Sequence, residues 1–449
     1  MKLDWQALDR WMMGEAWVGS PIRDHLGTLC DEIGPRWSSS EAEWAAIHYL
    51  RERMEGAGLD QVAEKEYTLD TWSWSGAEAT VVEDGRPIDL LPFNRCPPVD
   101  LQGPLVDVGY GTPREVEARR DDLPGAVAVV ALGLEPFTDP LPLSERLVLL
   151  ARAGAAAAVV VESKSGRRIE YHSAGEWRTP GLSGHPLPTV TTSREDGALL
   201  RKLAQAGKSL RLQVASQFYS APSANVVGVL AGERWPEEEL VLGGHHDTVY
   251  GSPGGNDNAS GTIAAIETAR VLAALRAETG VGPGRTIRFA TFSAEEQKFQ
   301  GAYAFVERHY GEGRRPRLAI NLDELSTGRM KGLVLAFPHL RDLVQRQMDT
   351  MHDGLQCHVM AQLDPTSDHF PFLRAGIDAA FLWRWRFAGR HADAEYHHER
   401  GDTADKVNVP ELKQYIGQLA RLLLRLSHVP PEEWPENPLT AEQVQARLD

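Results

Sequence analysis

One stretch of the chain reads ELVLGGHHD at residues 239–247. Its apolar run is typical of a buried strand, and two histidines and an aspartate follow where the strand is expected to end. A second motif, GNDNASG at residues 255–261, comes after a glycine-rich loop and opens a helix with one apolar face. Ser260 is the predicted cap of this helix and Gly280 its predicted stop. The two motifs together predict a strand–loop–helix unit of an α/β fold.

Further acids and imidazoles follow the next predicted strands. Residues 285–292 precede SAEE at 293–296, residues 318–322 precede an Asp-Glu pair at 323–324, and YHHERGDT stands late in the chain at 396–403. Ligands bind beyond the carboxyl ends of strands in open α/β sheets, so we expect these groups to meet there. Imidazole and carboxylate without thiolate suit zinc and similar divalent ions. The set is large enough for two metals that share a bridging carboxylate.

Each motif alone has a plainer interpretation. A His-x-Asp is more often a structural hydrogen-bonded pair, and a Glu-Glu is usually a solvated surface. An Asp-Asn-x-Ser-Gly can be a turn with a helix cap, and adjacent histidines can capture metal by chance. The motifs occur together, each at a strand end, and this combination favours a metal site.

The chain divides into four predicted parts. Residues 1–85 mix helix and strand signals, and a proline-rich crossing then leads into a small α/β domain over residues 86–218. Residues 219–430 alternate short apolar strands with helices, which is typical of a mostly parallel sheet covered on both faces. Residues 431–449 form a proline- and acid-rich tail that we expect to be peripheral.

Composition excludes several classes of protein. The 449 residues include 47 Lys+Arg and 63 Asp+Glu, a formal net charge of −16, which argues against nucleic-acid and anionic-membrane partners. The three cysteines are far apart and predict neither a disulfide framework nor a cysteine-type zinc finger. Neither a signal peptide nor a membrane span is evident. A cytoplasmic location is expected, with a secreted mature form as the alternative.

Taken together, these motifs resemble a known family, the co-catalytic di-zinc exopeptidases that include bacterial leucyl aminopeptidase, carboxypeptidase Q and glutamate carboxypeptidase. The resemblance extends to LCDEIGPR at residues 29–36. The middle part resembles a protease-associated domain in GAVAVV (125–130), RAGAAAAV (152–159) and PTV (188–190). The resemblance implies a three-layer zinc-exopeptidase fold with a mostly parallel central sheet and a smaller inserted α/β domain. It covers nearly the whole chain apart from the tail.

The resemblance assigns five metal ligands by position. His245 and Asp323 would hold one zinc, Glu296 and His398 the other, and Asp257 would bridge the two. The implied cofactors are therefore two zinc ions, with cobalt or manganese as substitutes.

The resemblance also assigns catalytic roles. Asp247 would orient His245 and fix its tautomer, and Glu295 would be the general base. When bound, the two ions would lower the pKa of a water and polarise the scissile carbonyl. His246 and His397 are then neighbours of ligands and not ligands themselves.

Three details concern the surroundings of the ligands. Relatives often have a cis peptide after the bridging aspartate, which here is the bond Asp257–Asn258. They often have Gly-Leu-x-Gly-Ser after the Glu pair, where this chain has QKFQGA at residues 297–302. The resemblance therefore leaves the shape of this loop undetermined. Asp368 and His369 lie in a segment beside the active site of relatives, and a pocket wall, an oxyanion contact and a structural role are all alternatives for them.

The main functional prediction is a metal-dependent exopeptidase that acts on small peptides. Among exopeptidases, an aminopeptidase is favoured. A carboxypeptidase or dipeptidase is the alternative enzyme. Cyclases of N-terminal glutamine share the core but usually lack the inserted domain. A receptor-like pseudo-peptidase is the non-enzymatic alternative, which the complete ligand set disfavours. Trp5, Trp11 and Trp17 predict core packing, with a self-association surface of a homo-oligomer as the alternative.

Overall fold

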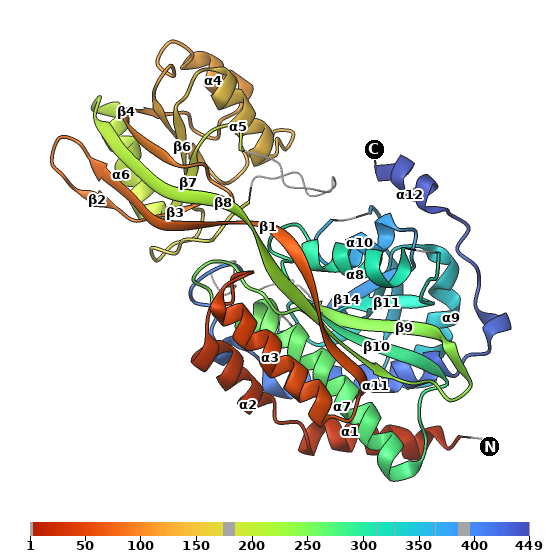
Figure 1. The fold of residues 1–449 in the computed structure, drawn as a ribbon. Helices are drawn as coiled ribbons and strands as arrows, with labels where there is room; N and C mark the ends of the chain where they lie inside the picture. Colours follow the sequence, from red (N-terminus) through yellow and green to blue (C-terminus); the bar gives the residue numbers. More distant parts are fainter. Residues whose placement is uncertain are drawn as a thin grey trace. The chain divides into compact units, whose positions relative to one another are not determined.

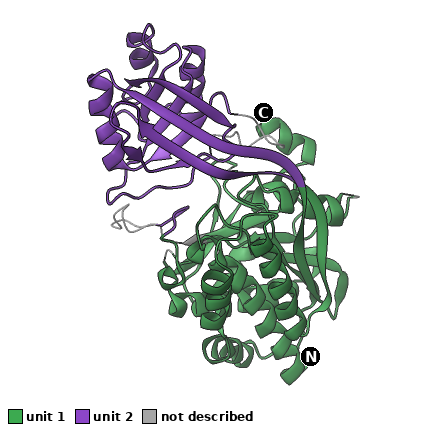
Figure 2. Cartoon of the chain, turned by 60° about the vertical axis from the view of Figure 1, so that its left-hand side comes forward, with its two compact units in different colours: residues 1–69, 221–390, 401–449 green, residues 70–220, 391–400 purple. Residues whose placement is uncertain are grey.

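The computed structural model describes residues 3–173, 185–311, 313–326, 328–363, 365–384 and 396–448. The chain forms two compact units (Figure 2). Unit 1 comprises residues 1–69, 221–390 and 401–449, and unit 2 comprises residues 70–220 and 391–400. Two long strands, β1 (Asp60–Val81) and β8 (Ser209–Leu230), run from one unit into the other (Figure 1). The domain limits predicted from the sequence stay predictions.

Unit 1 is built from a sheet and the helices that cover it. Its own strands are β9 (Trp235–His245), β10 (Arg285–Phe292), β11 (Leu318–Asn321), β12 (Met330–Leu335), β13 (Gln356–Val359) and β14 (Ala379–Arg384). Its helices are α1 (Trp5–Val18), α2 (Ile22–Leu26), α3 (Glu41–Gly56), α7 (Gly261–Thr279), α8 (Gln300–Tyr310), α9 (Arg341–Asp349), α10 (His369–Arg374), α11 (Val409–Ser427) and α12 (Ala441–Leu448). Short helical turns add η1 (Gly27–Ile33), η2 (Gly255–Ser260), η3 (Pro338–Leu340), η5 (Ala404–Lys406) and η6 (Pro431–Glu433).

The sheet of unit 1 has the strand order β13-β12-β14-β11-β9-β10-β8. Its parallel pairs are β10 with β9, β9 with β11, β11 with β14, and β12 with β13. Only β8 with β10 and β12 with β14 are antiparallel among the described strands of this order. The prediction of a mostly parallel sheet is therefore confirmed.

Helices cover both faces of this sheet. Helices α1, α3, α7 and α11 lie on one side of it, and α8 and α10 lie on the other (Figure 1). The core between them is aliphatic and includes Leu242 on β9, Ile263 on α7 and Leu419 on α11, all of them fully buried. This arrangement confirms the predicted three-layer α/β fold.

The first helix after the metal motifs shows one correct and one wrong terminus prediction. Gly280 ends α7 in the left-handed conformation, with φ of 71°, as predicted. Ser260 does not cap α7, because its backbone is already helical and its hydroxyl donates to Asn256 O at 2.7 Å. The side chain of Asn258 instead accepts from Gly261 N at 2.9 Å. An Asn whose own backbone lies outside the helix reaches the first free amide, which a residue already in the helix cannot do.

Unit 2 is the smaller α/β body. Its sheet continues from β8 in the order β4-β5-β6-β7-β3, and β1 pairs with β2. Helices pack on a core that includes Val130, Val160 and Leu150. The strands are β2 (Pro87–Ile88), β3 (Leu90–Pro92), β4 (Val99–Asp107), β5 (Val127–Ala131), β6 (Ala157–Val161) and β7 (Thr189–Thr192), and the helices are α4 (Pro113–Ala118), α5 (Leu143–Arg152) and α6 (Arg194–Gln205).

The N-terminal tryptophans divide between core and surface. Trp5 and Trp11 pack against the core of unit 1, and Trp11 also donates to Glu278 at 3.2 Å. Trp17 is 51% exposed. Core packing therefore accounts for Trp5 and Trp11, and self-association stays a prediction. Within the described ranges, every helix is too short or too polar to traverse a lipid bilayer.

Candidate metal centre

His245 stands at the carboxyl end of β9 and is the centre of the site. Its Nε2 lies 3.2 Å from Asp257 Oδ1 and 3.4 Å from Asp323 Oδ1. Its Nδ1 lies 3.1 Å from the backbone oxygen of Asp247 and 3.4 Å from the Oδ1 of the same residue. The ring is 1% exposed, so both nitrogens are held away from water. Contact of Nδ1 with Asp247 leaves Nε2 as the atom that faces the other acids.

The fold brings the predicted ligands of unit 1 together. Candidate ligand atoms of His245, Asp257 and Glu296 lie within 4.8 Å of one another, and so do those of His245, Glu295 and Asp323. These residues come from the ends of β9, β10 and β11 and from η2, as the sheet-edge argument predicts. The fifth predicted ligand, His398, belongs to unit 2, and its part in binding metal stays a prediction.

The electrostatics of this cluster are dominated by carboxylates. Burial, together with the charges of Glu296 and Asp323, raises the pKa of Glu295 well above its usual range. Burial alone would lower the pKa of His245, but the charges of Glu295 and Asp323 raise it well above the usual value. The neighbouring carboxylates therefore favour a bound proton or another cation at this position.

Asp247 ties two strand ends together. Its Oδ1 accepts from Glu295 N at 3.1 Å and its Oδ2 from Glu296 N at 3.3 Å. Ser38 Oγ donates to Asp247 Oδ2 at 2.9 Å. The predicted orienting residue of His245 thus also fixes the backbone of both glutamates.

The loop that carries Asp257 is held from a distant part of unit 1. Asp402 accepts from Asn256 N at 2.8 Å and from Asp257 N at 2.9 Å. Burial raises the pKa of Asp402 to about 7, although these two amides favour its ionised form. The peptide bond Asp257–Asn258 is cis, which confirms the expectation from relatives. Asn258 is fully buried and donates to Leu322 O at 2.8 Å, which joins η2 to the end of β11.

The loop after β10 departs from the sequence pattern of relatives. Ala294, Lys298 and Phe299 all adopt positive φ, of 54°, 68° and 58°. Such a conformation is uncommon for residues other than glycine and clusters at functional sites. A Cβ at Gly301 would lie 2.1 Å from Ser293 O, so this position requires glycine. The loop therefore accepts a long side chain at 298 and keeps the glycine where the backbone is closest.

Arg36, in the LCDEIGPR motif, acts as an internal brace. Its buried guanidinium donates to the backbone oxygens of five residues, with Nε to His246 O at 2.8 Å and Nη1 to Pro253 O at 2.8 Å. Its backbone amide donates to Thr248 Oγ1 at 2.8 Å. Burial lowers the pKa of Arg36. The motif thus joins the end of β9 to the loop that leads to Asp257.

Glu43 was not identified from the sequence, where it is one more polar residue of a predicted helix. It lies on α3, is fully buried, and accepts from Ser293 Oγ at 2.6 Å and Ser223 Oγ at 2.8 Å. His246 Nε2 lies 3.6 Å from Glu43 Oε1. His246 therefore faces this network, and the structure supports its prediction as a neighbour of a ligand.

The segment with Asp368 lies next to the ligand Asp323. Ser367 Oγ donates to Asp323 Oδ2 at 2.7 Å and accepts from Asn321 Nδ2 at 2.7 Å. Asp368 is fully buried, and neither of its carboxylate oxygens has a hydrogen-bond partner among the described residues. Burial, with the charges of Asp247 and Asp323, raises the pKa of Asp368 well above its usual range. Its role stays open.

This donor set fits a divalent cation. Burying a carboxylate without a partner is costly, and here several acids surround one imidazole in a water-excluded position. Imidazole and carboxylate ligands without thiolate match zinc. The three cysteines are buried and free, and none belongs to this cluster.

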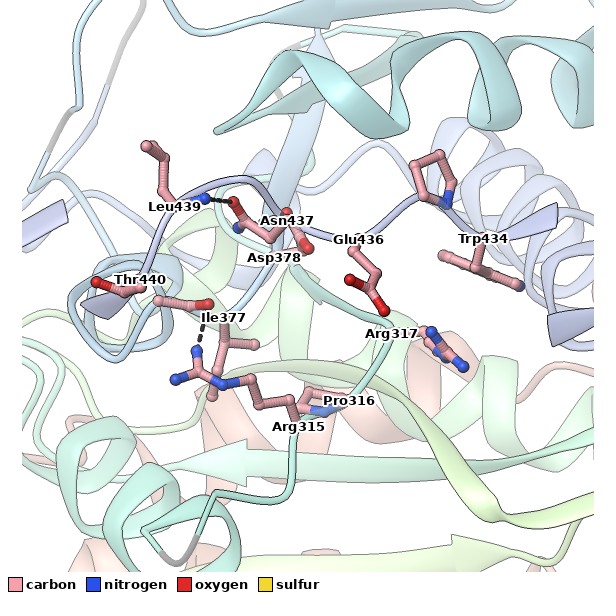
Figure 3. A pocket seen from close by; sticks show the side chains of 12 residues that line it. Arg315, Pro316, Arg317, Ile377, Asp378, Trp434, Glu436, Asn437, Leu439 and Thr440 are labelled. Carbon is pink, nitrogen blue, oxygen red and sulfur yellow. Dashed lines mark hydrogen bonds between the residues drawn. The ribbon is translucent and has the colours of Figure 1, made fainter. Parts of the chain in front are cut away.

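A separate pocket of unit 1 lies at the opposite ends of the strands. It is lined by residues 315–317, 376–378, 434–437, 439 and 440, next to the starts of β11 and β14 (Figure 3). Two of its charged side chains have protein partners: Arg317 pairs with Glu238 at 2.7 Å, and Asp378 accepts from Asn437 at 3.2 Å. The pocket therefore lacks the concentration of acids found at the metal cluster.

Comparison with known proteins agrees with this geometry. Residues 225–423 match the model of Peptidase family M28, and residues 101–200 match the PA domain. The chain is 28% identical over 371 residues to aminopeptidase YwaD of Bacillus subtilis, covering 80% of this chain and 74% of the relative. It is 24% identical over 391 residues to carboxypeptidase Q of Bos taurus, covering 85% and 79%.

Solved structures share the fold. A Peptidase M28 precursor from Shewanella amazonensis has a TM-score of 0.76 at 18% identity, covering 97% of this chain and 99% of the other. A zinc aminopeptidase from Bacillus subtilis has a TM-score of 0.72 at 22% identity, covering 94% and 98%. The predicted fold and inserted domain are confirmed. The chain thus resembles Peptidase family M28 over residues 225–423 and has a PA domain match over residues 101–200.

Proposed function

We propose that this enzyme is a zinc-dependent aminopeptidase, an exopeptidase that removes residues from the free amino end of small peptides. A peptide substrate follows from the family, and relatives named as aminopeptidases and carboxypeptidases support an exopeptidase. The proposed ligands are His245 and Asp323 for one ion, Glu296 and His398 for the other, and Asp257 for both. Two ions is the stoichiometry that this ligand set supports.

The proposal that the enzyme acts at the amino end of its substrate, and not at the carboxyl end, rests on the excess of carboxylates in the site. Six buried or partly buried acids of unit 1 take part in the cluster: Asp247, Asp257, Glu295, Glu296, Asp323 and Asp368. Two divalent ions would bring four positive charges and would displace protons from these acids, so six ionised carboxylates would leave a formal excess of two negative charges. A negative site attracts the α-ammonium of a substrate and repels a terminal carboxylate.

The chain's own residues then have defined tasks. When bound, the ions would activate a water and polarise the scissile carbonyl. Glu295, whose raised pKa reflects burial, would accept the proton of the attacking water and return it to the leaving amine. Asp247 holds the Glu295 amide, which keeps this base in place.

A substrate panel tests the proposal. We expect cleavage of aminoacyl anilides with a free amine and none of the same anilides after N-acetylation. N-blocked dipeptides with a free carboxylate should be inert, and their selective cleavage would establish a carboxypeptidase instead. Cleavage of dipeptides alone would establish a dipeptidase, and bound zinc without turnover of any substrate would establish a pseudo-peptidase.

A further inference from the structure

The segment that carries His398 is held by unit 2 through backbone and ring contacts. Tyr171 N donates to His398 O at 2.9 Å, and His398 Nδ1 lies 3.1 Å from Tyr171 O. Both residues belong to unit 2, although 227 positions separate them in the sequence. A metal-binding histidine usually directs one ring nitrogen at a carbonyl or carboxylate and binds the metal through the other, so the contact of Nδ1 assigns the role of metal ligand to Nε2.

The next residue, Glu399, is clamped by two cations of the same unit. Lys164 Nζ lies 2.7 Å from Glu399 Oε1, and Arg168 forms a bidentate pair with Nε–Oε2 of 2.6 Å and Nη2–Oε1 of 2.7 Å. The Glu399 side chain is only 4% exposed. The guanidinium of Arg168 also stacks 4.6 Å from the ring centroid of Tyr396. Bidentate Arg–carboxylate pairs fix geometry more tightly than single contacts.

The surroundings keep this clamp charged. Burial alone would lower the pKa of Lys164, but Glu170 and Glu399 raise it. Lys164 Nζ lies 2.9 Å from Glu170 Oε2, and His172 Nε2 lies 2.7 Å from Glu162 Oε1. Cations and acids thus alternate through this cluster, and a charge removed from it leaves a buried partner uncompensated.

We propose that Lys164 and Arg168 are positioning residues for His398: by clamping Glu399, the inserted unit fixes the backbone and ring of the fifth metal ligand. The proposal rests on the proposed function, in which His398 binds zinc. It assigns to the inserted unit a part in metal binding, a role distinct from contact with substrate. Glu399 directly follows His398 in the chain. Loss of the contacts that hold Glu399 is therefore expected to displace the His398 ring.

The test measures zinc affinity on the full-length enzyme with the double variant Lys164→Ala/Arg168→Ala. Titration against buffered free zinc, with metal content per chain as the readout, should show one zinc bound about 10–100-fold more weakly, as for other residues that orient ligands, and the other zinc unchanged. Glu399→Gln, a milder change, should shift the same zinc in the same direction. Arg114→Ala removes an exposed ion pair of unit 2 with Glu135 and should leave both zinc affinities unchanged.

His398→Ala separates failure of the proposal from failure of the proposed function. If His398→Ala retains both zinc ions at wild-type affinity, the ligand assignment is wrong and the proposal goes with it. If His398→Ala loses one zinc while the clamp variants bind both normally, only the positioning role is wrong, whatever their thermal stability. In the His398→Ala background, the clamp variants should cause no further loss of zinc affinity, and an additive loss would also overturn the proposal.

Discussion

Two clusters of buried carboxylates in this chain are handled in opposite ways. Around Glu399 in unit 2, Lys164 and Arg168 supply the charges that the acids need. Around His245 in unit 1, several carboxylates lie next to one another. Burial and these neighbouring carboxylates raise the pKa of Glu295 well above its usual range. Burial alone would raise the pKa of Glu170 in unit 2 as well, but interactions with neighbouring groups such as His172 and Lys164 outweigh this and lower it.

The difference distinguishes a structural network whose charges are balanced from an acidic site that is expected to bind a cation. Acids matched by the chain's own cations are balanced in the folded chain, and a change there is expected to lower stability, in addition to the effect on zinc affinity proposed for the Glu399 clamp. Acids that outnumber the nearby cations of the chain are expected to recruit a metal, and a change there is expected to act on catalysis and metal content.

The largest expected effect is on turnover, from Glu295→Gln. The amide cannot accept a proton, so kcat should fall by about 10²–10⁴-fold while the bound zinc is retained. Steady-state kinetics with metal analysis of the same sample measures both. Glu117→Gln, at an exposed glutamate of unit 2, serves as the matched control and should leave kcat unchanged. Near-normal turnover in Glu295→Gln would show that another group is the base.

Removal of metal should affect stability next. A ligand that binds only the folded state at 1,000 times its Kd stabilises by about 4 kcal/mol, so a chelator should lower the unfolding temperature and added zinc should restore it. Calorimetry of the wild type and of Asp257→Asn, which lacks the proposed bridging carboxylate, measures the effect. The chelator should shift the variant less. Equal unfolding temperatures of the wild type with and without chelator would remove the distinction between the two clusters.

Two isosteric changes, one in each cluster, test in metal-free protein whether their effects on the free energy of unfolding have opposite signs. Asp368→Asn removes a buried carboxyl group whose ionisation is disfavoured and which has no hydrogen-bond partner among the described residues, and should raise the free energy of unfolding by about 1–3 kcal/mol. Glu399→Gln breaks a buried ion pair and should lower it by about 2–4 kcal/mol. Denaturant unfolding in the presence of chelator compares the two. Changes of the same sign would mean that both clusters are organised alike.

The smallest effect concerns the half-buried imidazole of His309, where the charge of Glu239 does not offset the effect of burial. Burial and the charge of Arg288 lower the pKa of His309 to about 4, below the unfolded value of 6.5. The unfolded chain then binds the extra proton first, so stability is lost as the pH falls from about 6.5 to 4. His309→Gln should lose less stability than the wild type across this window, and thermal melts at pH 7, 5.5 and 4.5 measure it. Parallel pH profiles would contradict the lowered pKa.

The sequence predicted the parts of the site that local patterns encode. Apolar runs such as that of β9 indicate buried strands, and the polar groups after them meet because parallel strands end at one edge. The assignment of Asp257, Glu296 and Asp323 came from the resemblance to relatives, and their convergence on His245 agrees with it. The roles themselves stay predictions.

The parts that depend on long-range contacts could not be predicted. Glu43 on α3 contacts Ser293, 250 positions away, and Arg168 contacts Glu399, 231 positions away. No periodicity or spacing links such residues, and each alone looks like a solvated polar side chain. The wrong cap at Ser260 has a more local cause, because the Asn two positions earlier takes the role through an unusual loop.

The division of the chain into its units has a consequence for synthesis on the ribosome. Unit 2 is almost continuous, but it is completed only by residues 391–400, which follow residue 220 by 171 positions. At about 5–20 residues per second, translation separates these events by roughly 10–30 s. Most of unit 2 thus emerges from the ribosome well before the segment with His398 and Glu399. We expect this segment to pack onto the rest of unit 2 after that part has been synthesised. Zinc binding by the five proposed ligands would then be among the last steps of folding.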